Sequence, residues 1–260
     1  MSVVSVELQQ STIVRYGKEL HLPTVCAQFA RLAGEAAKQG QSHLSYLEAL
    51  LEAEVEERTR NAIARRVVDA HFPIVKTLEE FKFEEAPIVP VALIRNLADG
   101  DYIKRSEPII FLGDTGSGKT HLAIGLGVAA CRQRRRVRFT TAAALINELT
   151  EAKSKNELNR ITGRWTRYEL IVIDEMGYVG VPESAAELLF QVISGRAERA
   201  AVIITTNLPF SEWTTMFPNA RLCKAILDRL TDQAHIIETG KDSYRFRRTL
   251  EKRNGGKISS

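Results

Sequence analysis

The octapeptide GDTGSGKT, at residues 113–120, most constrains the fold because it stands between the apolar run PIIFL and the apolar stretch HLAIGLGVAAC. It matches the pattern G-x-x-x-x-G-K-[ST] in the strand–loop–helix context that this pattern requires. Glycines at positions 113, 116 and 118 let backbone amides surround phosphate oxygens, and the start of a helix favours a bound anion. The octapeptide therefore predicts a loop that binds the phosphates of a nucleotide.

Nucleotide chemistry assigns roles to the last residues of this loop. Lys119 is expected to neutralise the β- and γ-phosphates of ATP, and Thr120 to ligate Mg²⁺. A chance match in a glycine-rich turn is the alternative, and the flanking strand and helix patterns disfavour it. We expect the nucleotide to contact Gly113, Asp114, Thr115, Gly116, Ser117, Gly118, Lys119, Thr120 and His121.

Apolar runs alternate with helical stretches from residue 106 onward. This alternation predicts an α/β fold, a parallel five-stranded sheet with helices on both faces. The expected strands are Ile109–Leu112, Val137–Thr140, Leu170–Ile173, Val202–Thr205 and His235–Glu238.

Two adjacent acids, Asp174 and Glu175, follow the apolar run LIVI. They could be solvated loop residues, part of a GTPase switch (D-x-x-G), or a magnesium-side acid beside a residue that prepares water for attack. A GTPase needs N-K-x-D after a later strand, where this chain has TNLP, and a small-molecule kinase usually has an arginine-rich lid. Asp174 is therefore expected to hold Mg²⁺ through water, and Glu175 to act as the base.

Asn207 follows the apolar run AVIITT and is the third polar residue expected at the site. The strand before it lies next to the phosphate-loop strand in many ring-type ATPases, so Asn207 can hold the attacking water together with Glu175. A turn-forming role ahead of Leu-Pro is the alternative. The order of the three motifs favours the catalytic interpretation.

The N-terminal part has a different pattern. Residues 1–11 are expected to be disordered, and residues 16–70 helical, with apolar residues at three- and four-residue spacing. Prolines then interrupt the helical period in FPIVKTLEEFKFEEAPIVP. We expect a helical domain over residues 1–70 that binds DNA or a partner, a linker and core entry segment over 71–105, and the nucleotide-binding domain over 106–260.

Composition limits the compartment. Hydrophobic residues make up 44% of the 260 residues, and no apolar run approaches the ~20 residues that span a bilayer. The three cysteines are far apart without metal-ligand spacing, which is typical of a reducing cytosol. We find no signal peptide pattern. The expectation is a soluble, cytoplasmic protein with no membrane partner.

The chain resembles the IstB-type transposition helper ATPases of bacterial insertion sequences, which are AAA+ proteins related to the DnaC/DnaI helicase loaders. The resemblance rests on segments in the family's order: GDTGSGKTHLA, LIVIDEMGYV, ITTNLPFSEW, AILDRLTDQAHIIE and SYRFR. It implies an AAA+ phosphate-loop core, a small helical N-terminal domain and a reduced or absent C-terminal lid. It further implies a homo-oligomeric ring or spiral on DNA, with ATP at the subunit junctions.

The resemblance also implies roles for two arginines. Arg229 in AILDRL matches the arginine that a neighbouring subunit supplies to the γ-phosphate, and a surface or ion-paired arginine is the alternative. Arg245 in SYRFR matches a second sensor of the nucleotide. An arginine in trans makes hydrolysis depend on assembly.

A helical insertion after the second expected strand is the candidate DNA contact. Relatives that initiate replication or load helicases carry an extra helix at this place, lining a central channel. Its basic residues would bind phosphates with weak sequence specificity, and an ordinary solvated helix is the alternative. The expected contacts are Lys153, Lys155, Arg160 and Arg164.

These expectations combine into one function: an ATPase, with ATP and Mg²⁺, that assembles on double-stranded DNA and assists a cognate transposase in target-site selection. DNA should stimulate its hydrolysis. A replicative helicase loader shares the same ATPase core and is one alternative. A DNA-binding scaffold locked by ATP, in which hydrolysis is incidental, is the other.

Overall fold

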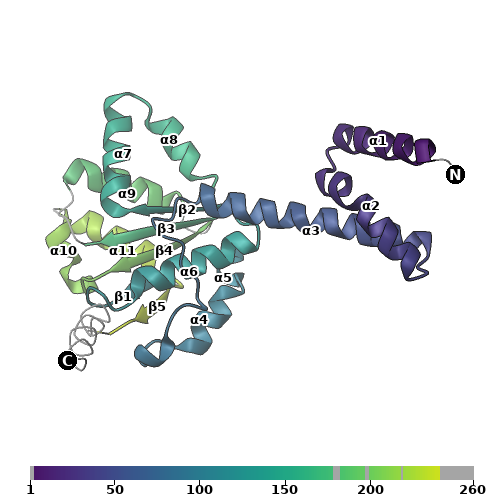
Figure 1. Cartoon of the computed structure of the whole chain (residues 1–260). Coiled ribbons are helices and arrows are strands. Elements are labelled where there is room, and N and C mark those ends of the chain that lie inside the picture. Colours follow the sequence, from purple (N-terminus) through teal and green to yellow (C-terminus); the bar gives the residue numbers. More distant parts are fainter. Residues whose placement is uncertain (1–2, 178–181, 197–198, 218, 241–260) are drawn as a thin grey trace, which may run out of the picture. The chain divides into compact units, whose positions relative to one another are not determined.

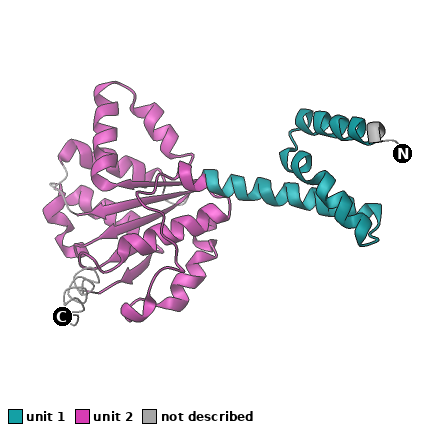
Figure 2. Ribbon diagram, in the orientation of Figure 1, with its two compact units in different colours: residues 1–65 teal, residues 66–260 magenta. Residues whose placement is uncertain are grey.

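The structure, a computed structural model, describes residues 3–177, 182–196, 199–217 and 219–240. The chain consists of two compact units, residues 1–65 and residues 66–260 (Figure 2). The boundary falls inside a helix, α3, whose last residues belong to the second unit. Within the described part of the chain, no helix has both the length and the apolar character needed to cross a bilayer.

The first unit is built from helices α1 Val3–Glu19, α2 Pro23–Lys38 and the larger part of α3 His43–Asp69. Its small core consists of Val25, Phe29 and Leu50, and Val14 of α1 packs against this core. The prediction that residues 1–11 are disordered is wrong for residues 3–11, because α1 is one continuous helix that packs on α2. Its N-terminal half, VVSVELQQ, has apolar residues one or two positions apart, so its spacing does not predict a helix.

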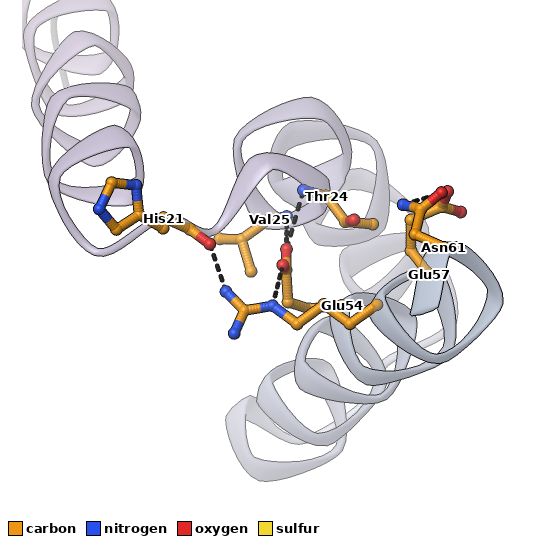
Figure 3. Close-up of polar contacts among 7 residues, drawn as sticks. His21, Thr24, Val25, Glu54, Glu57 and Asn61 are labelled. Carbon is orange, nitrogen blue, oxygen red and sulfur yellow. Dashed lines mark hydrogen bonds and ion pairs between the residues drawn. The ribbon is translucent and has the colours of Figure 1, made fainter. Parts of the chain in front are cut away.

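A buried carboxylate joins α3 to the start of α2 (Figure 3). Glu54 is 3% exposed, and its Oε2 accepts hydrogen bonds from the backbone N–H groups of Thr24 (2.8 Å) and Val25 (3.1 Å). Its Oε1 pairs with Arg58 Nε at 2.8 Å, and Arg58 also donates to the carbonyl of His21. Burial raises the pKa of Glu54, but the bonds from Arg58, Val25 and Thr24 outweigh it and hold the pKa below its usual value. Glu54 thus caps a neighbouring helix.

The second unit contains the predicted five-stranded parallel sheet, and its strand order is β2-β3-β4-β1-β5 (Figure 1). Each expected strand is present, and three of them are longer than expected by one to three residues. The strands are β1 Ile109–Leu112, β2 Val137–Thr141, β3 Leu170–Met176, β4 Ala201–Thr206 and β5 His235–Glu238.

Helices cover both faces of the sheet, and strand side chains alternate between the two layers (Figure 1). Val172 of β3 packs in the first layer, and Ile171 and Ile173 pack in the second, so the run from Leu170 to Ile173 is apolar without interruption. The first layer contains α4 Val91–Ala98, α5 Asp101–Lys104 and α6 Lys119–Arg132. The second contains α7 Ala142–Ser154, α8 Leu158–Trp165, α9 Glu183–Ser194, α10 Trp213–Met216 and α11 Ala220–Thr231.

The segment between α3 and α4 lies along α6 and includes the short 3-10 helix η1 Phe83–Glu85. Two glycines of α6 make this contact close. A Cβ at Gly125 would lie 2.6 Å from Leu78 Cδ2, and one at Gly127 would lie 2.9 Å from Phe72 Cε1. Any larger residue at these positions would push the segment away from the helix that follows the phosphate loop.

Candidate nucleotide-binding site

The phosphate loop connects β1 to α6, as the octapeptide predicts. Gly116 and Gly118 have φ of 88° and 97°, a backbone region that disfavours residues with a Cβ. Gly118 is the N-cap of α6, and the Ser117 N–H donates to the Asp114 carbonyl at 3.2 Å. The loop therefore curls at the N-terminus of a helix that extends to Arg132, where the helix dipole favours an anion.

Lys119 lies over the phosphate loop. It is 8% exposed, and its Nζ donates to the carbonyls of Gly113 and Asp114, both at 2.7 Å. These bonds hold the ammonium group beside the backbone that would surround a phosphate. The cation is therefore already placed for the neutralising role that the sequence predicts.

Thr120 and Asp174 meet at the carboxyl end of β3. The Thr120 hydroxyl donates to both carboxylate oxygens of Asp174, at 2.9 and 3.1 Å, and Asp174 is 4% exposed. A hydroxyl beside a carboxylate is a set of hard oxygen ligands, the kind that Mg²⁺ prefers together with nucleotide phosphates and water. These two residues therefore fit the metal that the phosphate loop implies.

Glu175 lies within β3, which continues to Met176 instead of ending before the acids. The register with β4 shifts between Ile173 and Met176, so the strand forms a bulge there. Glu175 itself has φ of 62°, in the left-handed region that few non-glycine residues adopt, and it is exposed. The bulge thus gives two neighbouring acids different environments: Asp174 is buried and Glu175 open to solvent.

Thr205 of β4 connects these two acids, and the sequence analysis assigned it no role. Its hydroxyl donates to Asp174 Oδ1 and accepts the Glu175 N–H at 3.0 Å. A hydroxyl directly after the apolar run AVII was the only sign of it in the sequence. Contacts across 30 and 31 residues cannot be read from spacing.

Asn207 follows β4 at the same edge of the sheet. The Gly113 N–H donates to the Thr206 carbonyl at 3.2 Å, so the residue before Asn207 directly contacts the phosphate loop. The buried Oδ1 of Asn207 has no hydrogen-bond partner in the described part of the chain. An amide oxygen without a partner can accept a hydrogen bond from a ligand or water.

The end of β5 holds the phosphate loop from the other side. Thr239 and Ser117 share a hydrogen bond between their hydroxyls at 2.6 Å, and both residues are buried. The Asp114 N–H also donates to the Gly240 carbonyl at 3.1 Å. These contacts, which the sequence analysis did not anticipate, fix the loop between the ends of β4 and β5.

His121, also expected at the nucleotide, contacts the segment before α4. A ring nitrogen of His121 lies 2.8 Å from the Thr77 carbonyl, and the ring meets Phe81 edge-on with centroids 5.2 Å apart. Burial lowers the pKa of His121, which favours the neutral ring. Phe81 also approaches Gly118, where a Cβ would lie 2.7 Å from its ring. This aromatic pair packs beside the loop.

Arg229 does not join these residues within one chain. It is exposed in the last turn of α11 and, with the buried Arg196, lines a small apolar cavity near Pro108 and Ala200, which precede β1 and β4. The phosphate loop follows the opposite end of β1, and a strand of this length separates the two edges by roughly 13 Å. The arginine and the loop thus lie at opposite edges of the sheet.

The four predicted DNA-contact residues lie on the helices α7 and α8 and the turn between them (Figure 1). All four are exposed. Three of the four pair with nearby acids: Lys155 with Glu151 (2.6 Å), Arg160 with Glu157 (2.6 Å) and Arg164 with Glu148. Surface ion pairs are worth ~0–1 kcal/mol, so these side chains can exchange their acidic partners for phosphates.

Arg245, the expected second sensor of the nucleotide, lies outside the described residues.

Solved structures share this fold. DnaA from Aquifex aeolicus bound to AMPPCP has a TM-score of 0.55 at 19% identity, over 73% of this chain and 57% of that one. Domain III of the Thermotoga maritima replication initiation protein DnaA has a TM-score of 0.50 at 18% identity, over 71% and 76% of the two chains. This chain spans a little over half of the Aquifex chain, and the likeness concerns the AAA+ fold alone.

Sequence relatives are closer. An insertion-sequence ATP-binding protein of Sinorhizobium fredii is 34% identical over 92% of this chain and 81% of its own. The IS5376 ATP-binding protein of Geobacillus stearothermophilus is 36% identical over 90% and 94%. The IS21 ATP-binding protein of Pseudomonas aeruginosa is 36% identical over 88% and 85%. The family model described as IstB-like ATP binding protein matches residues 16–252, so the chain belongs to the IstB-like family of ATP-binding proteins.

Proposed function

We propose that this protein hydrolyses ATP while assembled on double-stranded DNA, and that the assembly assists a transposase in selecting and engaging target DNA. The observation that carries the ATPase proposal is the placement of five residues at one edge of the sheet. The names of the relatives, which place them in insertion sequences, support the transposition role. The five are Lys119, Thr120, Asp174, Glu175 and Asn207.

Substrate binding uses the phosphate loop. The amides at the start of α6 and the Lys119 ammonium neutralise the phosphate oxygens of ATP. Thr120 and Asp174 would hold Mg²⁺, which supplies positive charge to the β- and γ-phosphates when bound. Because Asp174 is buried and Glu175 is open, the two acids divide the work between the metal and the water.

Attack by water uses Glu175 and Asn207. The Glu175 carboxylate takes the proton of the water as it attacks the γ-phosphate, and the free Oδ1 of Asn207 accepts the second hydrogen bond that orients it. The bulge in β3 leaves Glu175 exposed next to the buried Asp174, and this exposure supports the role of Glu175 as the base. Arg245 is proposed as a second sensor on sequence grounds alone.

Arg229 is proposed to act on a neighbouring copy. Its place at the opposite edge of the sheet keeps it from the loop of its own chain, and an arginine that meets the γ-phosphate from outside is worth ~10³–10⁵ in rate. The site is then complete only in a homo-oligomer, a ring or spiral. DNA that binds Lys153, Lys155, Arg160 and Arg164 would promote that assembly and so stimulate hydrolysis.

Sedimentation and phosphate release test this proposal together. The full chain is measured alone, with ATP and Mg²⁺, with duplex DNA, and with all of these. We expect a multimer and the highest hydrolysis rate only when ATP and duplex are both present. Glu175→Gln should bind ATP and DNA, remain assembled and release no phosphate. A monomer under every condition, or hydrolysis that DNA does not change, would refute the assembly mechanism.

The partner decides between transposition and helicase loading. Preference for single strands and capture of a hexameric helicase would support a loader, which shares the AAA+ core. Preference for duplex DNA and capture of a transposase would support the proposed role. ATP-dependent assembly with the same lifetime in the wild type and in Glu175→Gln would indicate a scaffold in which hydrolysis is incidental.

A further inference from the structure

Thr205 is a buried hydroxyl in the centre of the sheet. It is 1% exposed, and the strand around it is apolar. A buried hydroxyl is unfavourable unless its hydrogen bonds are made inside the protein. Thr205 makes both of them at the neighbouring strand: its hydrogen goes to Asp174 Oδ1, and its oxygen receives the Glu175 N–H at 3.0 Å.

The second bond replaces a missing backbone bond. In the register of β3 with β4, Ile173 pairs with Ile204 and Met176 with Thr206, so β3 uses three steps where β4 uses two. The extra residue leaves part of the β3 backbone without a ladder partner. The Thr205 hydroxyl takes the Glu175 N–H that the ladder does not.

This bond lies where the backbone is least favourable. Glu175 has φ of 62°, and a residue with a Cβ holds such a conformation only when its surroundings fix it. The two hydrogen bonds of Thr205 fix this part of β3 at two points, the Glu175 N–H and the Asp174 carboxylate. Without them, Glu175 could return to an extended backbone and its side chain would point elsewhere.

We propose that Thr205 is a positioning residue for hydrolysis: its hydroxyl holds the β3 bulge, and the bulge aims the Glu175 carboxylate at the attacking water. Thr205 does not touch ATP and acts through Glu175 and Asp174. The proposal rests on the proposed role of Glu175 as the base. If it is correct, replacing the Thr205 hydroxyl by a methyl group of similar size is enough to displace the Glu175 carboxylate.

Thr205→Val tests this because valine keeps the shape and β-branching of threonine and removes only the hydroxyl. We expect turnover at saturating ATP to fall by on the order of tenfold to a hundredfold, the effect of misplacing a reacting group by about 1 Å. ATP affinity, measured with a fluorescent analogue, should change less than threefold, because the loop itself is intact. Thr205→Ser, which restores the hydroxyl, should recover most of the turnover.

Ile203→Val, on the same strand, is the matched control. It removes one buried methyl group and should lower the melting temperature while leaving turnover within twofold. If Thr205→Val does not fold, Thr205→Ala serves instead, because it fits the same space. Turnover in Thr205→Val or Thr205→Ala within twofold of the wild type would overturn the proposal, and so would a failure of Thr205→Ser to recover it.

Comparison with Glu175→Gln separates this inference from the ATPase proposal. If Glu175→Gln alone hydrolyses ATP normally, the role of Glu175 fails. If Glu175→Gln is inactive and Thr205→Val is normal, only the role of Thr205 fails.

Discussion

Among the described residues, each of the two units buries one carboxylate, and the two carboxylates are held in opposite ways. Glu54 in the first unit receives two backbone N–H groups and pairs with the Arg58 cation. Asp174 in the second unit receives hydrogen bonds from the neutral hydroxyls of Thr120 and Thr205, and no ion pair involves it in the described part of the chain. Buried charges are paired or bind metals, so the first carboxylate has its cation in Arg58, and the environment of the second fits the Mg²⁺ site proposed for it.

This difference distinguishes a structural acid from the acid that is proposed to hold Mg²⁺. Glu54 fixes the start of α2, and a full set of partners makes it stable and inert (Figure 3). Asp174 is buried as deeply, at 4% exposed against 3%, but its partners leave its charge available. Burial alone therefore does not identify a site; the charge of the partners does.

Asp174→Asn removes the charge of the carboxylate in the second unit, and we expect the largest effect from this substitution, on the rate of hydrolysis. Loss of a metal-side carboxylate costs several kcal/mol of transition-state stabilisation, so Mg²⁺-dependent hydrolysis should fall on the order of a hundredfold or more. The melting temperature without ATP should stay at or above that of the wild type, because the hydroxyls can still donate to the amide oxygen. Phosphate release and tryptophan fluorescence measure the two quantities.

Tryptophan fluorescence reports on the unit that contains Asp174, because both tryptophans, Trp165 and Trp213, are buried in the second unit. Asp174→Asn that unfolds well below the wild type would show that the carboxylate is structural. Asp174→Asn that keeps its hydrolysis rate would remove it from the site.

Glu54→Gln removes the charge of the carboxylate in the first unit and tests its contribution to the stability of that unit. One Gln nitrogen would face N–H donors or Arg58, so the first unit should lose ~1–3 kcal/mol. Far-UV circular dichroism should show helix melting at a lower temperature, while the tryptophan signal of the second unit keeps its midpoint. Unchanged helix melting would contradict the capping role of Glu54.

The same carboxylate predicts a pH dependence. The pKa of Glu54 is lower in the folded protein than in the unfolded chain, so its contribution is present above the unfolded pKa of ~4.3 and is lost as the pH falls through the folded pKa. Acidification should therefore destabilise the first unit of the wild type more than that of Glu54→Gln. Parallel losses in both proteins would contradict this assignment.

Glu175→Gly tests the backbone strain next to Asp174, and we expect the smallest effect from it, on the stability of the second unit. Glycine adopts φ of 62° without strain, a gain of ~1–2 kcal/mol that its greater freedom when unfolded offsets by ~0.5–1 kcal/mol. We expect the second unit to be more stable than in Glu175→Gln by up to ~1 kcal/mol, with both variants inactive. Chemical denaturation followed by tryptophan fluorescence measures it, and a lower stability for Glu175→Gly would show that the bulge is unstrained.

The sequence predicts the sheet well because buried parallel strands are continuous apolar runs, as in Leu170–Ile173. It also predicts the phosphate loop, whose glycines meet a backbone requirement that few other residues can. It could not predict the helix over residues 3–11, whose apolar residues lack helical spacing. It also could not predict the bulge at Glu175, because a glutamate gives no sign of a left-handed backbone. Thr205 and Thr239 were missed because their partners lie 30 or more residues away.

A mixing experiment tests most directly the claim that one chain holds only half of a working site. Glu175→Gln and Arg229→Ala should each be inactive with ATP and duplex DNA. Mixed in equal amounts, they should regain roughly a quarter of the wild-type rate, because a quarter of random junctions join an intact Glu175 to an intact neighbouring Arg229. A mixture no more active than its parents, in oligomers shown to contain both chains, would contradict the account.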